Sequence, residues 1–211
     1  MQLLAEDDSV AKQVDTLILL AHGAGADMHH DFMQDMAKSL GAQGLNVVRF
    51  NFPYMRCNAL DGKRRPPDRA PKLLLDFKLH ITDLNERFRP KRLILMGKSM
   101  GGRMAAMLGH DTQLDGVICL GYPFIALKGG EPRLEPIAQC HAPLLVIQGE
   151  RDKFGGKGLV DTWLAPFNAE LKWLTDGDHS FVPRKSSGTT QAANLALAVS
   201  YSDNFVRSLH A

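Results

Sequence analysis

The pentapeptide Gly97-Lys98-Ser99-Met100-Gly101 constrains this chain more than any other stretch. It follows the apolar run 93–96 and precedes the helix-forming stretch 103–108, an order that predicts a strand, a sharp turn and a helix. A serine on such a turn has a strained backbone, and the residues two before and two after it must be small because strand and helix approach closely there. Gly97 and Gly101 meet that requirement. The alternative is an ordinary strand-to-helix connection that contains glycines and has no catalytic role.

The turn places Ser99 at the N-terminus of the following helix. Backbone N–H groups and the helix dipole favour negative charge that develops on a reacting oxygen at such a place. Ser99 is therefore the candidate nucleophile, and the N–H of Met100 is a candidate donor to the oxyanion.

A second oxyanion donor is expected from the loop His22-Gly23-Ala24-Gly25-Ala26-Asp27, which follows the expected buried strand 16–21. Its small residues let the backbone approach a ligand closely, so an N–H of Ala24 or Gly25 would face the oxyanion. His22 has no acid or nucleophile beside it in the sequence, and we expect it to brace the loop. A plain connection into the next helix is the alternative for this loop.

Two later strands end near residues that would complete an acyl-transfer site. Asp152 follows the expected strand 143–148, and His179 lies on the loop after the expected strand 170–174. Ser99, Asp152 and His179 occur in the chain order nucleophile, acid, base that is typical of α/β-hydrolases. In such a set the histidine takes the serine proton and the carboxylate holds the histidine tautomer. The alternatives for the acid are Glu150, Asp176 and Asp178.

Near-continuous apolar segments alternate with amphipathic ones along the chain, which predicts parallel strands buried on both faces and joined by helices. The pattern predicts an α/β-hydrolase fold in one domain, 1–211, with a mostly parallel central sheet of about six to seven strands and helices on both faces. A minimal lid is expected, because the connection 122–142 has room for one short helix only. Further strands are expected at 45–50, 92–96 and 116–120, and helices at about 31–40, 74–88, 103–109, 134–139, 159–164 and 191–209.

The connection 51–71 contains four prolines, which predicts an irregular segment at the edge that carries the strand-to-helix loops. The stretch 56–72 holds six basic residues against two acidic ones, a net charge of +4. With Lys98 beside the turn, this charge would attract an anionic substrate, so Gly25, Arg56 and Lys98 are candidate substrate-binding residues. A solvated loop face is the simpler interpretation of the basic stretch.

Composition argues against several classes of function. The chain has 211 residues, enough for one domain with a full core, and a net charge of +2, too small to indicate nucleic-acid binding. No stretch is apolar and long enough to cross a bilayer, and the first residues lack the pattern of a secretory signal. We therefore expect a cytoplasmic protein without membrane attachment. Three widely spaced cysteines predict neither a disulfide framework nor a zinc site.

Four strings, 22–27, 51–55, 97–103 and 177–181, carry a resemblance that covers nearly the whole chain. The chain resembles small α/β-hydrolases of the dienelactone-hydrolase-like type. More closely, it resembles a compact family of predicted hydrolases whose animal relatives include a testis-expressed protein and a subunit of a chromatin complex. True dienelactone hydrolases have a cysteine at the position of Ser99, so the resemblance does not imply dienelactone as the substrate. The relatives in chromatin assemblies imply a second possibility, a binding module.

These residues together predict a serine hydrolase of carboxylesterase or thioesterase type that needs no metal or organic cofactor. It would act on a small acyl ester through an acyl-enzyme, and that small molecule would be its binding partner. The protein would be a monomer or a homodimer. The alternative is a non-catalytic interaction module that keeps the fold and binds an anionic partner through the basic stretch 56–72. The intact set of Ser99, Asp152 and His179 favours the enzyme.

Overall fold

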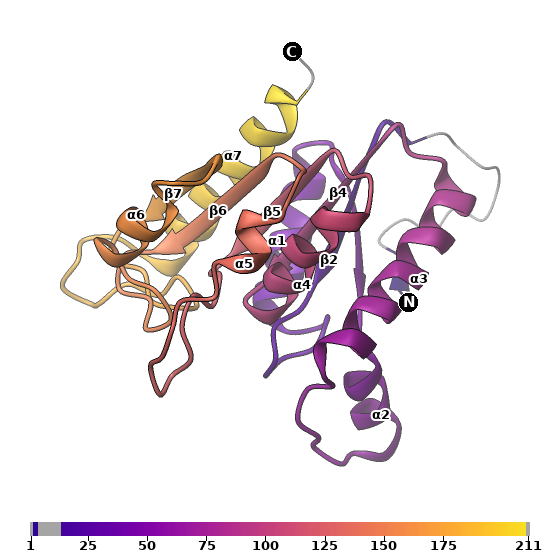
Figure 1. The fold of residues 1–211 in the computed structure, drawn as a ribbon, viewed down its shortest axis with the longest axis horizontal. Coiled ribbons are helices and arrows are strands. Elements are labelled where there is room, and N and C mark those ends of the chain that lie inside the picture. The colour runs from indigo at the N-terminus through magenta and orange to yellow at the C-terminus, as the bar shows by residue number, and fades with distance from the viewer. Residues whose placement is uncertain (1, 4–13, 210–211) are drawn as a thin grey trace.

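One twisted sheet organises the chain, with helices on both of its faces (Figure 1). The computed structural model describes residues 2–3 and 14–209, so residues 1, 4–13 and 210–211 of the predicted domain lie outside the described part. Six strands run parallel in the order β3-β2-β4-β5-β6-β7, and the short β1 pairs antiparallel with β3 at one edge. The predicted fold is therefore confirmed. The strands are β1 (Gln2–Leu3), β2 (Thr16–Ala21), β3 (Asn46–Phe50), β4 (Arg92–Lys98), β5 (Gly116–Leu120), β6 (Leu144–Gly149) and β7 (Ala169–Leu174).

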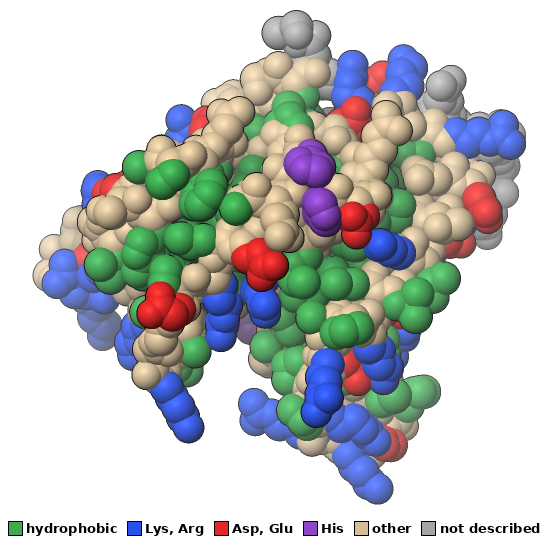
Figure 2. Space-filling view, viewed as in Figure 1, with side chains coloured by type: hydrophobic (Ala, Val, Ile, Leu, Met, Phe, Trp, Pro, Cys, Tyr) green, Lys and Arg blue, Asp and Glu red, His purple; other side chains and the backbone are tan. Residues whose placement is uncertain are grey.

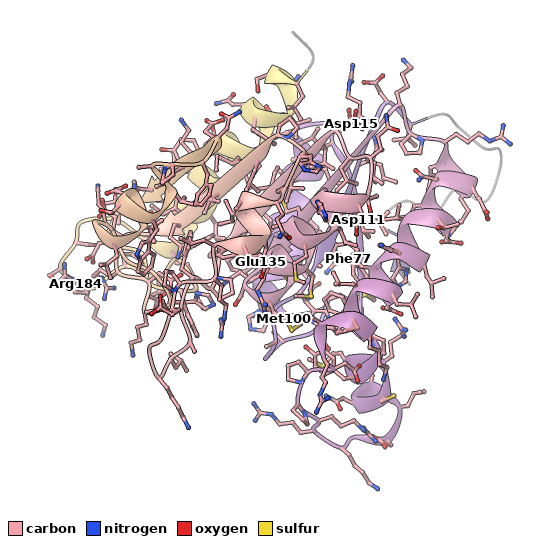
Figure 3. The ribbon with its side chains drawn as sticks, viewed as in Figure 1. Phe77, Met100, Asp111, Asp115, Glu135 and Arg184 are labelled. Atoms are coloured by element: carbon pink, nitrogen blue, oxygen red, sulfur yellow. The ribbon has the colours of Figure 1, made fainter. Side chains whose placement is uncertain are left out.

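The helices divide between the two faces because alternate residues of each strand point to opposite sides. Leu17 and Leu19 pack in the cluster that α3 to α6 cover, whereas Ile18 and Leu20 pack in the cluster that α1 and α7 cover. Phe77 of α3 is fully buried in the first cluster and lies between its helix and the sheet (Figure 3). The helices are α1 (Asp31–Ala42), α2 (Pro53–Asp61), α3 (Ala70–Phe88), α4 (Met100–Asp111), α5 (Glu135–Ala138), α6 (Leu159–Leu164) and α7 (Gln191–Ser208).

Helix α2 corrects the expectation that 51–71 is irregular throughout. Pro53 stands at the first helical position, where its missing N–H costs no hydrogen bond and its fixed φ suits the helix. Gly62 ends the helix in the left-handed conformation with φ of 70°. The proline that was expected to break structure therefore begins a helix, and only the stretch between α2 and α3 is irregular.

The segment between β5 and β6 contains one short helix, α5, as expected for a minimal lid. Within the described residues, no helix has the length and apolar character that a membrane span requires.

The parallel order of the strands brings four loops to one edge of the sheet. The loops after β2, β4, β6 and β7 all leave from carboxyl ends of strands, which is where α/β sheets bind ligands. These loops carry the candidate nucleophile, acid, base and oxyanion donors, so the topology gathers those residues at one place, whereas the segment 51–71 with Arg56 follows β3.

Candidate active site

The turn between β4 and α4 holds Ser99 in a strained conformation, with φ of 51° and ψ of −113°. A backbone of this kind typically costs about 1–3 kcal/mol and persists only where its surroundings enforce it. A Cβ added at Gly97 would lie 2.2 Å from the carbonyl carbon of Gly101, and one added at Gly101 would lie 2.6 Å from the carbonyl oxygen of Ala21. Both glycines are therefore required by the close approach of strand and helix.

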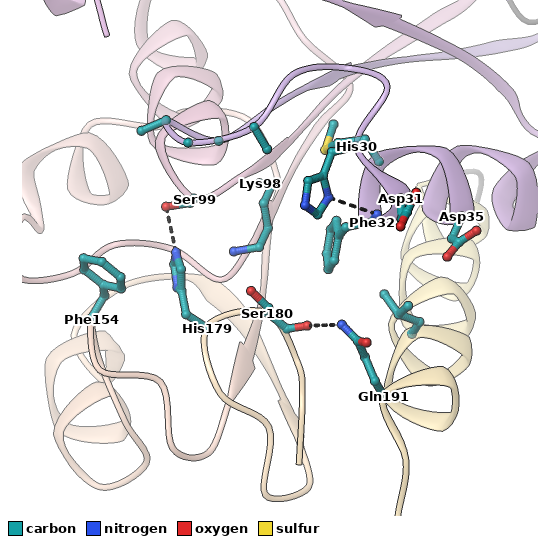
Figure 4. A pocket seen from close by; sticks show the side chains of 16 residues that line it. His30, Asp31, Phe32, Asp35, Lys98, Ser99, Phe154, His179, Ser180 and Gln191 are labelled. Atoms are coloured by element: carbon teal, nitrogen blue, oxygen red, sulfur yellow. Dashed lines mark hydrogen bonds between the residues drawn. The ribbon is translucent and has the colours of Figure 1, made fainter. Parts of the chain in front are cut away.

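Ser99, His179 and Asp152 form one hydrogen-bonded chain. Oγ of Ser99 lies 2.9 Å from Nε2 of His179 (Figure 4), and Nδ1 of His179 lies 2.7 Å from Oδ2 of Asp152. A carboxylate accepts at Nδ1, so that nitrogen carries the proton and Nε2 is left to accept from the serine hydroxyl. The arrangement has the geometry of a nucleophile, its base and the acid that orients the base.

Asp152 is held by donors on both of its oxygens. Its side chain is fully buried. Oδ2 accepts from Nε2 of Gln148 at 3.0 Å as well as from the histidine, and Oδ1 accepts from the backbone N–H of Phe154 at 2.8 Å. The ring of Phe154 lies 4.3 Å from the ring of His179, centroid to centroid, and limits how far the imidazole can turn. The carboxylate and the aromatic ring together fix the histidine.

The three other acids considered from the sequence have different partners. Asp178 accepts from the backbone N–H groups of Ser180 and Val182, and so shapes the histidine loop. Asp176 forms ion pairs with Arg151 at 2.8 Å and with Arg184 at 2.6 Å.

Glu150 accepts from Nζ of Lys157 at 2.7 Å and from the N–H of Asp176 at 2.9 Å. Of the four acids, Asp152 is the one that the described structure places against His179.

The loop after β2 runs beside the serine. A Cβ added at Gly23 would lie 3.6 Å from Cβ of Ser99. The hydroxyl of Tyr54 donates to the carbonyl oxygens of Gly23 and Ala24, at 3.3 and 3.1 Å, so the carbonyls of this loop are tied to α2. Among the described residues, the N–H groups of Ala24 and Met100 donate to no other group, which leaves both free for a ligand oxygen.

His22 braces this loop in its neutral form. The ring is fully buried, with Nδ1 2.7 Å from the carbonyl oxygen of Gly23 and Nε2 accepting from the N–H of Phe52 at 3.0 Å. A ring that donates at one nitrogen and accepts at the other is uncharged. Burial lowers the pKa of His22, which agrees with this state.

A pocket of about 530 Å³ opens in front of the serine (Figure 4). Its wall includes the predicted residues Ala24, Gly25, Lys98, Ser99 and His179. The other lining residues come mainly from the loop after β2, α1 and α7: Gly23, Ala26, His30, Asp31, Phe32, Met33, Asp35, Phe154, Ser180, Gln191 and Leu195. In the described part of the chain, no group of three His, Cys, Asp or Glu side chains could hold a metal ion.

Arg56 is not among the residues that line this pocket. Its guanidinium binds the buried carboxylate of Asp76 on α3, with N–O distances of 2.5 and 3.1 Å, and donates to the carbonyl oxygen of Asn51. This pair ties α2 to α3. The structure thus gives Arg56 a structural partner instead of a place at the site.

Three further residues of the basic stretch line a pocket of their own beside the loop after β2. Lys63, Arg64 and Arg65 line a second pocket of about 270 Å³ together with Ala24 and Gly25. Figure 2 shows Lys and Arg side chains gathered over α2 and the loop that follows it. Ion pairs neutralise two basic side chains of the stretch locally, because Arg65 binds Asp61 and Lys72 binds Asp68 at 2.9 Å.

Three residues that shape the site were not singled out from the sequence: Gln148, Phe154 and Tyr54. Gln148 left a signal, since it is the polar residue in an otherwise apolar buried strand, and such a residue needs a hydrogen-bonding partner. Phe154 left a weaker one as an aromatic residue two positions after the acid. Tyr54 left none, because its partners lie about thirty residues away in the sequence.

Comparison with known proteins agrees with this architecture. Residues 14–207 match the family described as alpha/beta hydrolase domain. A serine hydrolase homologue from Coxiella burnetii is 19% identical, with a TM-score of 0.67 over 96% of this chain and 88% of that one. A serine hydrolase without lid from Xanthomonas campestris is 21% identical, with a TM-score of 0.68 over 98% and 86%.

An esterase from Pyrococcus furiosus is 17% identical, with a TM-score of 0.69 over 92% of this chain and 83% of that one. At these identities the likeness to solved structures shows the fold alone, whereas the family match covers nearly all of the described residues. The chain belongs to the alpha/beta hydrolase domain family.

Proposed function

We propose that this protein is a serine hydrolase that cleaves a small acyl ester or thioester. The observation that carries the proposal is the hydrogen-bonded chain from Ser99 through His179 to the buried Asp152, at distances of 2.9 and 2.7 Å. The strained backbone at Ser99 adds support, because residues in such costly conformations are typical of functional sites and this one presents the hydroxyl as a nucleophile.

In the proposed mechanism, Oγ of Ser99 attacks the carbonyl carbon of the substrate while Nε2 of His179 takes the hydroxyl proton. Asp152 stabilises the imidazolium that results, and the N–H groups of Ala24 and Met100 bind the oxyanion. The tetrahedral intermediate expels the alcohol or thiol, which takes the proton from His179. Water then attacks the acyl-enzyme with the same histidine as its base, and the acid product leaves Ser99 free.

The size and openness of the site favour small substrates. The pocket holds about 530 Å³, and the described residues between β5 and β6 contain no helix long enough to close over it. One structural neighbour is an esterase and another is a serine hydrolase without lid, which agrees with this choice. We also propose that the chain is related to the dienelactone-hydrolase-like and chromatin-complex hydrolases, and that the protein is cytoplasmic.

The test is labelling with a fluorophosphonate probe, followed by a screen of short acyl esters and thioesters. Wild-type protein should be labelled and should hydrolyse at least one of them. Ser99→Ala should lose the labelling, and its turnover should fall by about 10⁶-fold, as expected for loss of the nucleophile. Ser39→Ala on α1, a serine outside the pocket, is the matched control and should behave as wild type. Wild-type turnover by Ser99→Ala would exclude this mechanism.

The second candidate function is a module that binds an anionic partner without catalysis. The observation in its favour is the cluster of Lys63, Arg64 and Arg65 beside the loop after β2. The same experiment separates the two functions: folded wild-type protein that neither reacts with the probe nor turns over any ester would favour the binding module.

A further inference from the structure

Lys98 stands immediately before the nucleophile, at the end of β4, and its side chain enters the pocket. In Figure 4 it extends into the space between His179 and Phe32. Only 9% of the residue is exposed, although it lines the pocket. A Cβ added at Gly121 would lie 3.0 Å from Nζ of Lys98 and 3.2 Å from the carbonyl oxygen of His179. The ammonium group therefore lies beside the histidine loop, at the end of a side chain that is largely buried and that reaches the pocket.

No acid is paired with this ammonium in the part of the chain that the structure describes. No hydrogen bond or ion pair there includes Nζ of Lys98; its close neighbours are the rings of Phe32 and Phe181, whose centroids lie 5.6 and 5.9 Å away. Aromatic faces attract a cation but supply no hydrogen-bond acceptor of the kind that water or a carboxylate provides. A buried charge without such acceptors is costly, and that cost needs an explanation.

The acids near Lys98 are bound to other groups. Asp152 and Asp178 attract the ammonium through space, but Asp152 accepts from His179, Gln148 and a backbone N–H, and Asp178 accepts from two backbone N–H groups. Asp31 and Asp35 are exposed on α1 at the far side of the pocket, beyond Phe32 as seen from Ser99 in Figure 4.

We propose that Lys98 determines substrate specificity by binding a carboxylate on the acyl chain of the substrate. The substrate class is then an ester or thioester of a small dicarboxylic acid whose second carboxyl group is free. This inference rests on the proposed function and deepens it. Lys98 offers three N–H donors that the described residues leave unused, and a ligand carboxylate would supply acceptors and an ion pair in direct contact.

The carboxylate belongs to the acyl part of the substrate for a mechanistic reason. The alcohol or thiol must leave before water can enter, whereas the acyl group stays on Ser99 through both halves of the reaction. A buried anchor next to the nucleophile can position the ester and then the acyl-enzyme only if it holds the acyl group.

A monoanionic carboxylate fits better than a phosphate dianion. The pocket offers one ammonium group, and its rim carries the carboxylates of Asp31 and Asp35, which would repel a second negative charge. The basic residues 63–65 line a different pocket, which Lys98 does not line.

The test compares methylumbelliferyl esters of succinic, glutaric and adipic acid with esters in which the free carboxylate is replaced by a primary amide. The measured quantity is the ratio of kcat/KM for the carboxylate ester to kcat/KM for its amide, with Ser99→Ala as the blank. In wild type we expect a ratio above one for at least one chain length. Lys98→Met should lower that ratio by about 10- to 100-fold, the range expected for a lost charge-assisted hydrogen bond.

The matched control is Lys38→Met, an exposed lysine on α1 that is not part of the pocket, and it should leave the ratio unchanged. A phosphonate-terminated ester is the third substrate. Equal rates for carboxylate and amide esters in wild type, an unchanged ratio in Lys98→Met, or a preference for the phosphonate would each overturn the assignment.

A binding measurement separates this inference from the proposed function. Glutaramate, the anionic half-amide of glutaric acid, should raise the melting temperature of wild-type protein, while neutral glutaramide should not. If no ester is turned over but glutaramate still stabilises wild type and not Lys98→Met, the anion site stands and the hydrolase proposal fails. If neutral esters are turned over without any carboxylate preference, the hydrolase stands and the anion site fails. If Lys98→Met does not fold, two measurements on wild type decide whether the anion site exists: the rates of carboxylate and amide esters, and the melting temperatures with glutaramate and with glutaramide.

Discussion

Burial of the Lys98 ammonium should cost the folded protein stability, and Lys98→Met should recover it. Burial lowers the pKa of Lys98 from 10.5 to about 8. At about 1.4 kcal/mol for each pKa unit, the charged form is less stable in the folded protein by about 3 kcal/mol at pH 7. Methionine has nearly the same length, no charge and a side chain suited to the Phe32 and Phe181 rings, so the variant should be about 2–3 kcal/mol more stable at pH 7.

The sign of the pH dependence gives a second, sharper expectation. Between pH 8 and pH 10.5 the unfolded chain keeps the Lys98 proton while the folded protein has lost it. The penalty that this group imposes on the stability of wild type therefore decreases as pH rises through that window. The advantage of Lys98→Met should shrink by about 2 kcal/mol between pH 7 and pH 9.5, and contributions from other groups cancel in the difference.

The assay is urea denaturation of wild type, Lys98→Met and the exposed control Lys38→Met at both pH values. The control should change the free energy of unfolding by less than about 0.5 kcal/mol at either pH, as is usual for a surface substitution. A Lys98→Met variant that is less stable than wild type at pH 7, or whose advantage does not change with pH, would refute the claim that the buried ammonium is charged and without a partner.

Three further predictions concern the groups around the nucleophile. Asp152→Asn should lower kcat by about 10⁴-fold through loss of the correct histidine tautomer, and Asp178→Asn should lower it less on the same ester. A larger loss in Asp178→Asn would show that the acid is misassigned. Tyr54→Phe removes the donor to the carbonyls of Gly23 and Ala24, so kcat should fall by about 10-fold with little change in KM. Burial lowers the pKa of His22, so the stability that its neutral ring contributes is present above pH 6.5 and is lost as pH falls; urea titrations from pH 7.5 to pH 5 should show the gap between wild type and His22→Gln narrowing.

The strands and the elements near Ser99 could be predicted because their signals are local. A buried parallel strand must be apolar on both faces, so β2 and β6 appear in the sequence as short apolar runs that end in small or polar residues. The two glycines around Ser99 follow from a steric requirement that acts over five residues. Asp152 could be chosen over Asp178 because it follows a strand of its own, whereas the chain order nucleophile, acid, base fits both acids, and nothing in the sequence shows which carboxylate reaches His179.

What could not be predicted depends on partners distant in the sequence. The four prolines of 51–71 favoured an irregular segment, but Pro53 is compatible with a helix start, and α2 is fixed by the contact of Arg56 with Asp76 on α3. The same contact removes Arg56 from the site. Its positive charge was visible in the sequence, but the carboxylate that neutralises it lies twenty residues away.

The position of Lys98 in β4 connects the fold to the specificity that we propose. Strand residues alternate between faces, so Lys98 shares a face with Ile94 and Met96, which are buried in the cluster covered by α1 and α7. The next position in that series would suit another apolar side chain, packed against Phe32 and Phe181. A lysine there ends the core early and puts a charge at the inner wall of the pocket, one residue from the nucleophile. If the lysine has no role toward the substrate, Lys98→Met should improve stability without changing which ester is preferred. If it serves the substrate, stability and carboxylate preference must move in opposite directions in that one variant.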